Sequence, residues 1–415
     1  MRYVYVALLF LTSCTFNKTL QKNKAIAEAY YQVGEYANAI VYYQKIHKHE
    51  QDIYSLLKIV ESYQTIHDYD HALEWALKIN QDQITDSLTY LKALLYKSVG
   101  KYELAKNHYE LIYDLHIDTL FIPSCDSALL WRNSPNGKIE NLSRLNSEYS
   151  DNSPMFYNEG MVFASSRDNP FGKKHQGQTN EPFFDIYKTR LTKQKQWTNP
   201  ISFSSNINSA RHEGALCFNH DESILYFTRS SGNKYVKERG ENVVHLKLFK
   251  SIKGKTGWKR PESFMLNDSV YSVGHPTISE DGQVFIFSSD MPGGHGGVDL
   301  YITFKVGDKW KIPVNLGPEV NTIGDETYPF LTRGGKLFFS SNGHLTMGGF
   351  DVFSCQFKEG TWTDVKNLKF PVNSSADDFS FILDENGKRG IMSSNRLGGK
   401  GKEDLYQVVF SKPMD

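Results

Sequence analysis

The chain has 415 residues, a length that predicts two or three domains rather than one. Hydrophobic residues make up 40% and charged residues 23%, the composition of a globular protein that buries real cores. Its 47 basic and 47 acidic residues cancel, which excludes an overall field that would draw the protein to nucleic acid. Partners must therefore be recognised by local sites.

The first residues predict an export signal. Arg2 supplies a basic tip, and the apolar run over residues 4–11 is too short to cross a bilayer. The run ends in Leu11-Thr12-Ser13-Cys14, which resembles the lipobox of bacterial lipoproteins. This resemblance implies that a signal peptide over 1–13 is removed, that the Cys14 thiol is lipidated, and that 14–21 form a lipidated linker. A chance cysteine after an ordinary export signal is the alternative.

Lipid chains on Cys14 would bury enough methylene groups, at about 0.8 kcal/mol each, for stable membrane anchoring. The residues that follow, Thr15-Phe16-Asn17-Lys18, contain no acidic cluster of the kind that resembles a surface-export signal. We therefore expect an outer-membrane lipoprotein that faces the periplasm.

Residues 22–120 contain an internal repeat. Tyr36, Tyr69 and Tyr102 are spaced 33 positions apart, and alanines at 39, 72 and 105 keep the same step. This step is close to the tetratricopeptide period, and the segment resembles that family over about three repeats. Gly34 and Gly100 are expected to end the first helix of a pair in the left-handed conformation, with a histidine at 67 replacing the glycine. The resemblance implies a groove for peptides or partner helices; a docking spacer is the alternative.

Residues 121–415 change to short β-branched and aromatic runs separated by Gly, Asn, Asp and Ser. Five repeated units of four short strands begin near Asp151, Glu213, His275, Glu326 and Asp378. In most units a strand with a tryptophan (197, 258, 310 and 362) leads to Asn-Leu and a second Asn. Repeats of this length and strand content predict the blades of a β-propeller.

The fifth unit lacks its tryptophan strand. However, Asn141-Leu142 and Asn146 match the missing strand motif and precede the first unit. We therefore expect this segment to form the outer strand of the last blade and to close a five-bladed ring, because an incomplete blade would leave an open sheet edge.

The propeller unit can also be compared with a known family. The pattern Phe287-Ser288-Ser289, Gly293-Gly294 and Asp299-Leu300-Tyr301 resembles the TolB-type propeller repeat of bacterial periplasmic proteins. The expected fold class is α + all-β multidomain, with tetratricopeptide helical hairpins followed by a β-propeller. The combination is similar to envelope proteins of type IX secretion and gliding motility, in which an OmpA-like peptidoglycan-binding domain often follows. The sequence to Asp415 contains no such domain, which puts direct peptidoglycan binding in doubt.

Two sets of carboxylates stand out in the repeats. The aspartates that precede each third strand are expected to accept backbone N–H groups and fix the preceding turn: Asp185, Asp299, Asp351 and Asp404. They lie on different blades and so cannot converge on a metal ion.

The acidic residues at the inner-strand starts are the candidate binding set: Glu148, Asp151, Glu213, Asp325, Glu326, Asp377 and Asp378. We expect them at one mouth of the central channel, where they would bind a cation or a Lys/Arg-rich partner segment. The alternative is that they are solvated and cap turns. His275 replaces the acid in the third unit, so the ring is incomplete.

Catalytic and metal signatures are missing from the sequence. There is no G-x-S-x-G elbow, P-loop or C-x2-C pair, and the histidines at 212, 220, 295 and 344 lack zinc-site spacing. Three cysteines remain after Cys14, and Cys217 and Cys355 lie in apolar runs where buried free thiols are expected. The prediction is no metal, no cofactor and no enzymatic activity.

Taken together, these features predict a non-enzymatic, outer-membrane-anchored interaction scaffold. Its expected partners are envelope proteins of a type IX secretion or gliding complex, and no nucleic acid. An alternative is a propeller that binds a glycan or peptidoglycan fragment, which exposed aromatic rings beside the channel mouth would favour. A degenerate hydrolase is a third possibility, but no residues are left unassigned for a catalytic domain.

Overall fold

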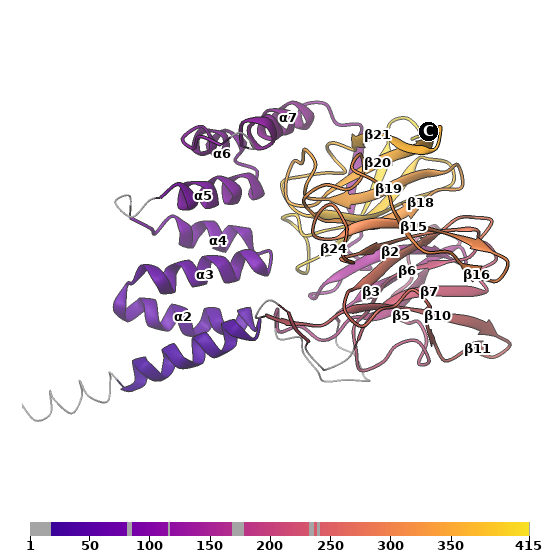
Figure 1. The fold of residues 1–415 in the computed structure, drawn as a ribbon, viewed down its shortest axis with the longest axis horizontal. Coiled ribbons are helices and arrows are strands. Elements are labelled where there is room, and N and C mark those ends of the chain that lie inside the picture. The colour runs from indigo at the N-terminus through magenta and orange to yellow at the C-terminus, as the bar shows by residue number, and fades with distance from the viewer. Residues whose placement is uncertain are drawn as a thin grey trace, which may run out of the picture. The chain divides into compact units, whose positions relative to one another are not determined.

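The computed structural model describes residues 18–80, 85–114, 117–167, 178–231, 236–238 and 241–414. The chain separates into two compact units, one comprising residues 1–96 with 175–181 and 236–243, and the other comprising the remainder. Figure 1 shows helices in the first third of the chain and strands thereafter. Cys14, the predicted lipid attachment site, lies outside the described residues.

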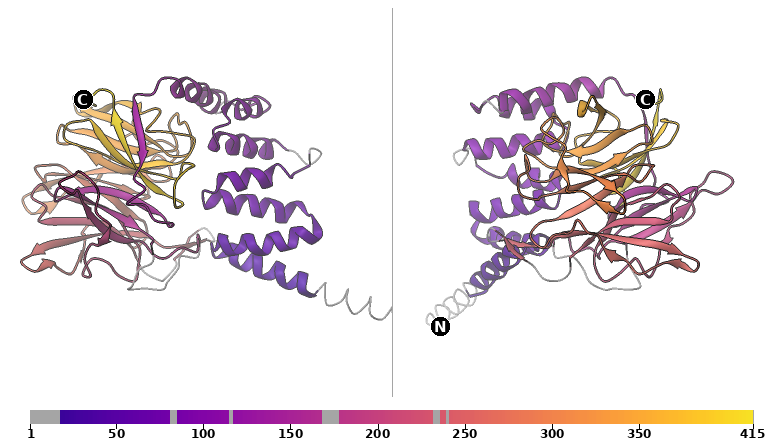
Figure 2. Two further views of the ribbon diagram at one scale, coloured as in Figure 1. Left: turned by 180° about the vertical axis from the view of Figure 1, so that it is seen from behind. Right: turned by 45° about the vertical axis from the view of Figure 1, so that its right-hand side comes forward.

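The helical part consists of short consecutive helices. After a helix over 18–32 come α2 (Tyr36–Glu50), α3 (Ile53–Thr65), α4 (Tyr69–Ala76), α5 (Asp86–Ser98), α6 (Tyr102–Tyr109), the π-helix η2 (Ile117–Phe121) and α7 (Ile122–Arg132). Helices α2, α3 and α4 lie side by side in sequence order, as Figure 2 shows. None of the described helices is long and apolar enough to cross a membrane.

Local sequence explains where these helices begin and turn. Asp52 and Asp68 cap α3 and α4 by accepting the backbone N–H groups of residues 55 and 71. Gly34 and Gly100 have φ angles of 76° and 73°, and His67 has a φ of 59° at the corresponding position. All three residues thus take the left-handed conformation, which is free of steric strain for the two glycines but not for the histidine. The periodic Ala39 and Ala72 are fully buried, which lets the helix backbones approach closely.

The second unit contains a five-bladed β-propeller, so this part of the sequence prediction is confirmed. Blade 1 contains β2 (Asp151–Tyr157), β3 (Gly160–Ser165), β4 (Asp185–Arg190) and β5 (Ile201–Ser202). Blade 2 contains β6 (Glu213–Phe218), β7 (Ile224–Ser230), β10 (Leu246–Gly254), β11 (Gly257–Trp258) and β12 (Glu262–Ser263). A separate two-stranded sheet, β8 (Val236–Glu238) and β9 (Glu241–Val243), belongs to the first unit.

The remaining blades follow the same antiparallel order. Blade 3 contains β13 (Val273–Ile278), β14 (Val284–Ser289), β15 (Asp299–Val306), β16 (Lys309–Trp310) and β17 (Val314–Asn315). Blade 4 contains β18 (Glu326–Leu331), β19 (Lys336–Ser341), β20 (Asp351–Lys358) and β21 (Thr361–Asn367). Blade 5 contains β22 (Asp378–Leu383), β23 (Arg389–Ser394), β24 (Asp404–Phe410) and β1 (Gly137–Asn141).

Strand β1 closes the ring as the sequence predicts. It pairs antiparallel with β24, with Gly137 opposite Phe410 and Asn141 opposite Tyr406. The side chain of Asn146 then bridges the backbone of Leu405, accepting its N–H at 2.9 Å and donating to its carbonyl at 3.0 Å. The expected outer strand of the last blade therefore comes from residues that precede the first blade.

The second asparagine of the repeat makes this same bridge in every blade. The equivalents of Asn146 bond both backbone groups of one residue near the start of the third strand: Asn208 with Ile186, Asn267 with Leu248, Asn321 with Leu300 and Asn373 with Val352. A bridge of this kind satisfies buried backbone groups where the fourth strand ends. The repeated asparagines are thus explained by the blade itself.

Each inner strand bulges near the propeller axis. Ser153, His275, Tyr328 and Ser380 are the bulged residues, with φ angles between 48° and 54°. At three seams between neighbouring blades, the backbone N–H of the bulged residue donates to a hydroxyl of the preceding blade: Ser153 to Ser393, His275 to Thr228 and Ser380 to Ser340. These bonds fix blade order around the axis, including the seam where blade 5 meets blade 1.

Candidate functional site

The predicted acidic ring lies largely inside the protein. Asp151, Glu213, Glu326 and Asp378 are the first residues of their strands, and all four are fully buried. Each carboxylate accepts the backbone N–H of the residue four positions earlier, at 2.5 to 3.0 Å. Their carboxylates thus hold the loop that enters the blade. The ligand-binding role predicted for these residues remains a prediction without support from this geometry.

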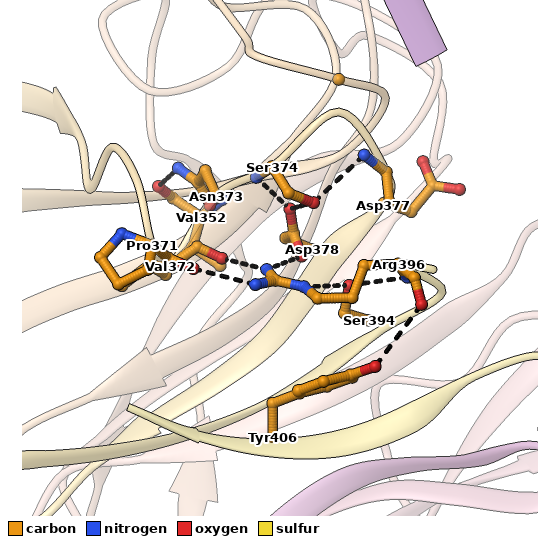
Figure 3. A network of polar contacts seen from close by, with 12 residues as sticks. Val352, Pro371, Val372, Asn373, Ser374, Asp377, Asp378, Ser394, Arg396 and Tyr406 are labelled. Atoms are coloured by element: carbon orange, nitrogen blue, oxygen red, sulfur yellow. Dashed lines mark hydrogen bonds and ion pairs between the residues drawn. The ribbon is translucent and has the colours of Figure 1, made fainter. Parts of the chain in front are cut away.

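In three blades an arginine completes the arrangement. Asp151 pairs with Arg167, Glu213 with Arg229 and Asp378 with Arg396. Figure 3 shows the blade 5 network, in which Arg396 also donates to the carbonyl oxygens of Pro371 and Val372 at 3.0 and 2.6 Å and to the Ser394 hydroxyl. Burial raises the pKa of Asp378 above its ordinary value, and the arginine opposes that rise.

The other members of the predicted set differ in exposure. Glu148 is exposed to solvent, whereas Asp325 and Asp377 accept the backbone N–H groups of Val298 and Phe350. In the third blade the strand start is Val273 rather than His275, which is instead the bulged residue two positions later. The predicted start of this blade therefore lies two residues after the observed start of its first strand.

The repeated aspartates all begin third strands and are buried. Asp299, Asp351 and Asp404 each accept two backbone N–H groups of the preceding Gly-containing turn. Each also accepts one side-chain amide N–H from the Asn-Leu asparagine of its blade. Asp185 differs, because its Oδ1 has no hydrogen-bond partner among the described residues. Burial and the nearby Glu213 carboxylate raise the pKa of Asp185 to about 7.

A cavity opens at the other end of the propeller, where the first and second strands of each blade connect. We call this end the hairpin mouth, defined by the turns 157–160, 219–223, 279–283, 332–336 and 384–389. The cavity has a volume of about 880 Å³. Apolar side chains form its walls: Met155, Phe156, Cys217, Phe218, Ile278, Phe330, Leu331, Phe357 and Leu383. A concave, mostly apolar space with polar groups at its rim is typical of a binding site.

Charged side chains form the rim of the hairpin mouth. His220 of blade 2 lies 3.3 Å from Glu280 of blade 3, which contacts Arg333 of blade 4 at 3.4 Å. Arg333 also pairs with Glu385 of blade 5 at 2.8 Å. In addition, Glu222 accepts the backbone N–H of Asn158 in blade 1 at 2.9 Å. The rim therefore links all five blades, although exposed pairs of this kind contribute little stability individually.

The cavity ends at a filled central channel. A second, very small cavity of about 20 Å³ lies among the bulged residues, and Met155 and Phe330 line both spaces. The rings of His275 and Tyr328 stack at 3.9 Å between centroids and occupy this part of the axis. Burial lowers the pKa of His275 to about 4, so this histidine is neutral at pH 7. The hairpin mouth thus leads into a blind cavity.

The cysteines that follow Cys14 in the sequence are buried in the structure. The thiols of Cys125, Cys217 and Cys355 are free and buried, and burial raises their pKa values above the ordinary range. Nowhere in the described part of the chain do three or more His, Cys, Asp or Glu side chains gather as a metal site would require. The hairpin-mouth cavity was not predicted from the sequence, because its apolar walls come from five blades that meet only in the folded ring.

Known proteins give only distant matches to this chain. Neither the known protein families nor the curated proteins give a match to this sequence. Among solved structures, a putative TolB from Agrobacterium tumefaciens matches with a TM-score of 0.37 and 12% identity, covering 66% of this chain and 97% of that one. A gluconolactonase from Xanthomonas campestris matches with a TM-score of 0.36 and 13% identity over 66% and 90% of the two chains.

A protein described as a glycoside hydrolase matches with a TM-score of 0.44 and 10% identity over 69% of this chain and 94% of that one. These neighbours include enzymes, so the sequence-based prediction that the chain is not an enzyme is wrong: a propeller without familiar catalytic motifs is no ground for that exclusion. At such identities and TM-scores the matches assign no activity, substrate or partner to this chain.

Proposed function

We propose that the chain is a binding protein of the bacterial envelope, anchored in the outer membrane through Cys14 and facing the periplasm. Its propeller binds a segment of a partner protein at the hairpin mouth. The supporting observation is the cavity of about 880 Å³, whose apolar walls and charged rim come from five blades. The helices supply a second interaction surface if, as their 33-residue spacing indicates, they are tetratricopeptide repeats.

The apolar walls and charged rim of the cavity favour a partner segment that inserts one apolar side chain and has polar groups on either side of it. Met155, Phe330 and Leu383 offer apolar surface at depth, while the side chains of Glu280 and Arg333 are about half exposed at the rim. Burial of one large apolar side chain contributes about 1.5 to 3 kcal/mol, enough to anchor a segment that the rim then orients. The proposed partners are components of a type IX secretion or gliding complex, as the resemblance of the sequence implies.

The decisive experiment is affinity purification from detergent-solubilised outer membranes with a cavity-filling variant. Met155→Trp places a larger side chain where the cavity meets the channel. The matched control is Leu397→Trp, since Leu397 is 80% exposed and lies in the loop between β23 and β24, at the opposite end of the blade. We expect the wild type and the control to recover the same secretion or motility components and Met155→Trp to lose them.

Two outcomes would contradict the proposal. If Met155→Trp recovers the same components as the wild type, the cavity does not take part in the interaction. If the wild type and both variants are purified without any partner under mild conditions, the proposed partners do not bind this protein. Anchoring is tested separately: Cys14→Ser should move the protein from the membrane fraction to the soluble fraction, and mass spectrometry should show the loss of acyl chains.

A second candidate is a glycan ligand, which the aromatic side chains of the cavity favour. Phe156, Phe218, Phe330 and Phe357 line it, and Phe357 is 54% exposed. Aromatic faces of this kind pack against the apolar faces of sugar rings. If soluble peptidoglycan fragments raise the Tm of the wild type and of Leu397→Trp but not of Met155→Trp, the ligand is a glycan rather than a protein segment.

A further inference from the structure

A second feature of the hairpin-mouth end is a concentration of basic residues on blades 1 to 3. The turns that join third and fourth strands, at 190–197, 250–260 and 305–311, contain eleven basic residues and one acidic residue, Asp308. The basic residues are Arg190, Lys193, Lys195, Lys250, Lys253, Lys255, Lys259, Arg260, Lys305, Lys309 and Lys311. We call these three turns the basic crescent. Its charge contrasts with the zero net charge of the whole chain.

The strand register places the basic crescent at the same end as the hairpin mouth. In blade 2, Phe218 pairs with Leu225, and Ile252 pairs with Ile224, so the turns 219–223 and 254–257 project from one end of the sheet. Backbone bonds join the two turns directly in blades 2 and 3, from Lys253 to Ser223 and from Lys305 to Gln283. The crescent therefore surrounds part of the cavity opening.

Aromatic packing holds neighbouring turns of the crescent in place. Trp258 of blade 2 packs against Phe203 of blade 1 at 5.9 Å between ring centroids. Trp310 of blade 3 packs against Phe264 of blade 2 at 6.3 Å. The lysines thus project from three turns whose bases are fixed to one another rather than from independent loops.

The charges of the basic crescent are available to a partner. Nine of the eleven basic side chains belong to exposed residues, the others being half-buried, and none forms an ion pair with any residue that the structure describes. The first-to-second-strand turns of these blades, nearer the axis, carry five acidic residues: Glu159, Asp221, Glu222, Glu280 and Asp281. Together with Asp308 they make six acidic residues against eleven basic ones, which leaves an excess of five positive charges on these turns of blades 1 to 3.

Each turn of the crescent also exposes an apolar side chain beside its lysines. Leu191 is 40% exposed, Ile252 43% and Val306 58%, and Ile312, next to Lys311, is 88% exposed. Apolar side chains among exposed lysines on one face are typical of proteins that lie on a membrane surface, where the apolar groups enter the boundary of headgroups and acyl chains.

From this arrangement we propose that the basic crescent docks the propeller onto a bilayer surface rich in anionic phospholipid headgroups. Nine of the basic residues are lysines, which act as point charges, whereas recognition of fixed carboxylate partners favours the planar fork of arginine. A fluid layer of phosphates satisfies scattered point charges without fixed geometry. The cavity opens on the same face, so a docked propeller meets partners presented by the membrane.

The test is flotation with vesicles, using the chain from residue 15 onward, which keeps every described residue and lacks the predicted lipid-accepting Cys14. We expect binding to vesicles that contain 30% phosphatidylglycerol, weaker binding to pure phosphatidylcholine, and release at high salt. The triple variant Lys193→Gln, Lys255→Gln and Lys309→Gln should lower the partition coefficient about 100-fold, roughly 5-fold for each side chain.

The matched control removes three exposed lysines of the helical part, Lys18→Gln, Lys22→Gln and Lys48→Gln, and should bind as the wild type does. The triple variant Leu191→Ser, Ile252→Ser and Val306→Ser should also bind less, because the apolar contribution to binding is lost. Equal loss in the control would show that only net charge matters, and no binding to anionic vesicles would overturn the proposal. If the crescent variant instead loses a captured acidic protein while vesicle binding is absent, the partner is a protein and the lipid assignment is wrong.

Discussion

Substitution of Arg396 by alanine tests whether the buried ion pair of blade 5 is required for stability. Asp378 is fully buried and Arg396 is 12% exposed, so water cannot replace the guanidinium. Its removal leaves the Asp378 carboxylate and the carbonyl oxygens of Pro371 and Val372 without their charged donor. Breaking a buried pair by removing one partner typically costs about 3 to 5 kcal/mol, and we expect Arg396→Ala to fall in that range.

The assay is urea unfolding followed by tryptophan fluorescence. Four of the six tryptophans, at 197, 258, 310 and 362, lie in or beside propeller strands and therefore report mainly on this domain. The control is Arg389→Ala, an exposed arginine on the same strand β23, which should change the free energy of unfolding by less than about 0.5 kcal/mol. A loss below about 1 kcal/mol for Arg396→Ala would refute the reasoning from burial.

The pH dependence of the same variant gives an independent check. Burial already raises the folded-state pKa of Asp378 above its unfolded value, and removal of Arg396 should raise it further. A carboxyl whose folded pKa is raised stabilises the fold below its unfolded pKa, and this stabilisation is lost as the pH rises through the folded pKa. The stability gap between wild type and Arg396→Ala should therefore narrow as the pH falls from 7 to 5; a constant gap would place the cost elsewhere.

Three further predictions concern the closure, packing and axis of the propeller. Asn146→Ala removes both bonds to the backbone of Leu405 and should lower the free energy of unfolding by about 2 to 4 kcal/mol in urea titrations, whereas Asn386→Ala, in an exposed turn, should leave it nearly unchanged. Gly401→Ala should prevent or greatly weaken folding, because the added methyl overlaps the Tyr149 carbonyl oxygen; Gly334→Ala, with its nearest neighbour 3.9 Å away, should be tolerated, and equal thermal midpoints would contradict this. His275→Phe should flatten the loss of stability between pH 6.5 and 4, because the folded pKa of about 4 lies below the unfolded value and stability is lost as the pH falls through this window; an unchanged slope would exclude His275 as its source.

The sequence predicted the architecture of the propeller because its repeats carry local structural requirements. Equivalents of Asn146 recur in all five blades, where a strand end needs a bridge, and equivalents of Asp404 begin the third strand in four of them. Their spacing therefore reports strand positions directly. The same logic identified the outer strand of blade 5 far from its partners, since the repeat motif at Asn141 was complete. Residues that repeat with one fixed structural role thus allow strand positions to be predicted from the sequence alone.

The candidate site was less predictable for two physical reasons. An acidic residue at a strand start gives the same sequence pattern whether its carboxylate contacts solvent or pairs with an arginine. The arginine partners, such as Arg167, lie near the end of the neighbouring strand and are distant in sequence. The hairpin-mouth cavity, in turn, is built from residues such as Met155 and Phe330 that belong to different blades and recur in no motif. Its position depends on the radial assembly of the blades, which no single repeat encodes.

Closure through β1 has a consequence for biosynthesis. Strand β1 is translated long before β24, the strand with which it pairs in blade 5 and which ends at Phe410. Until those last residues emerge, blade 5 lacks its outer strand, and β1 stays unpaired during translation. Because such distant pairings form slowly, the helices can mature while the ring is still open, and a ribosome that stalls near the end of the message would release a protein with an unclosed ring.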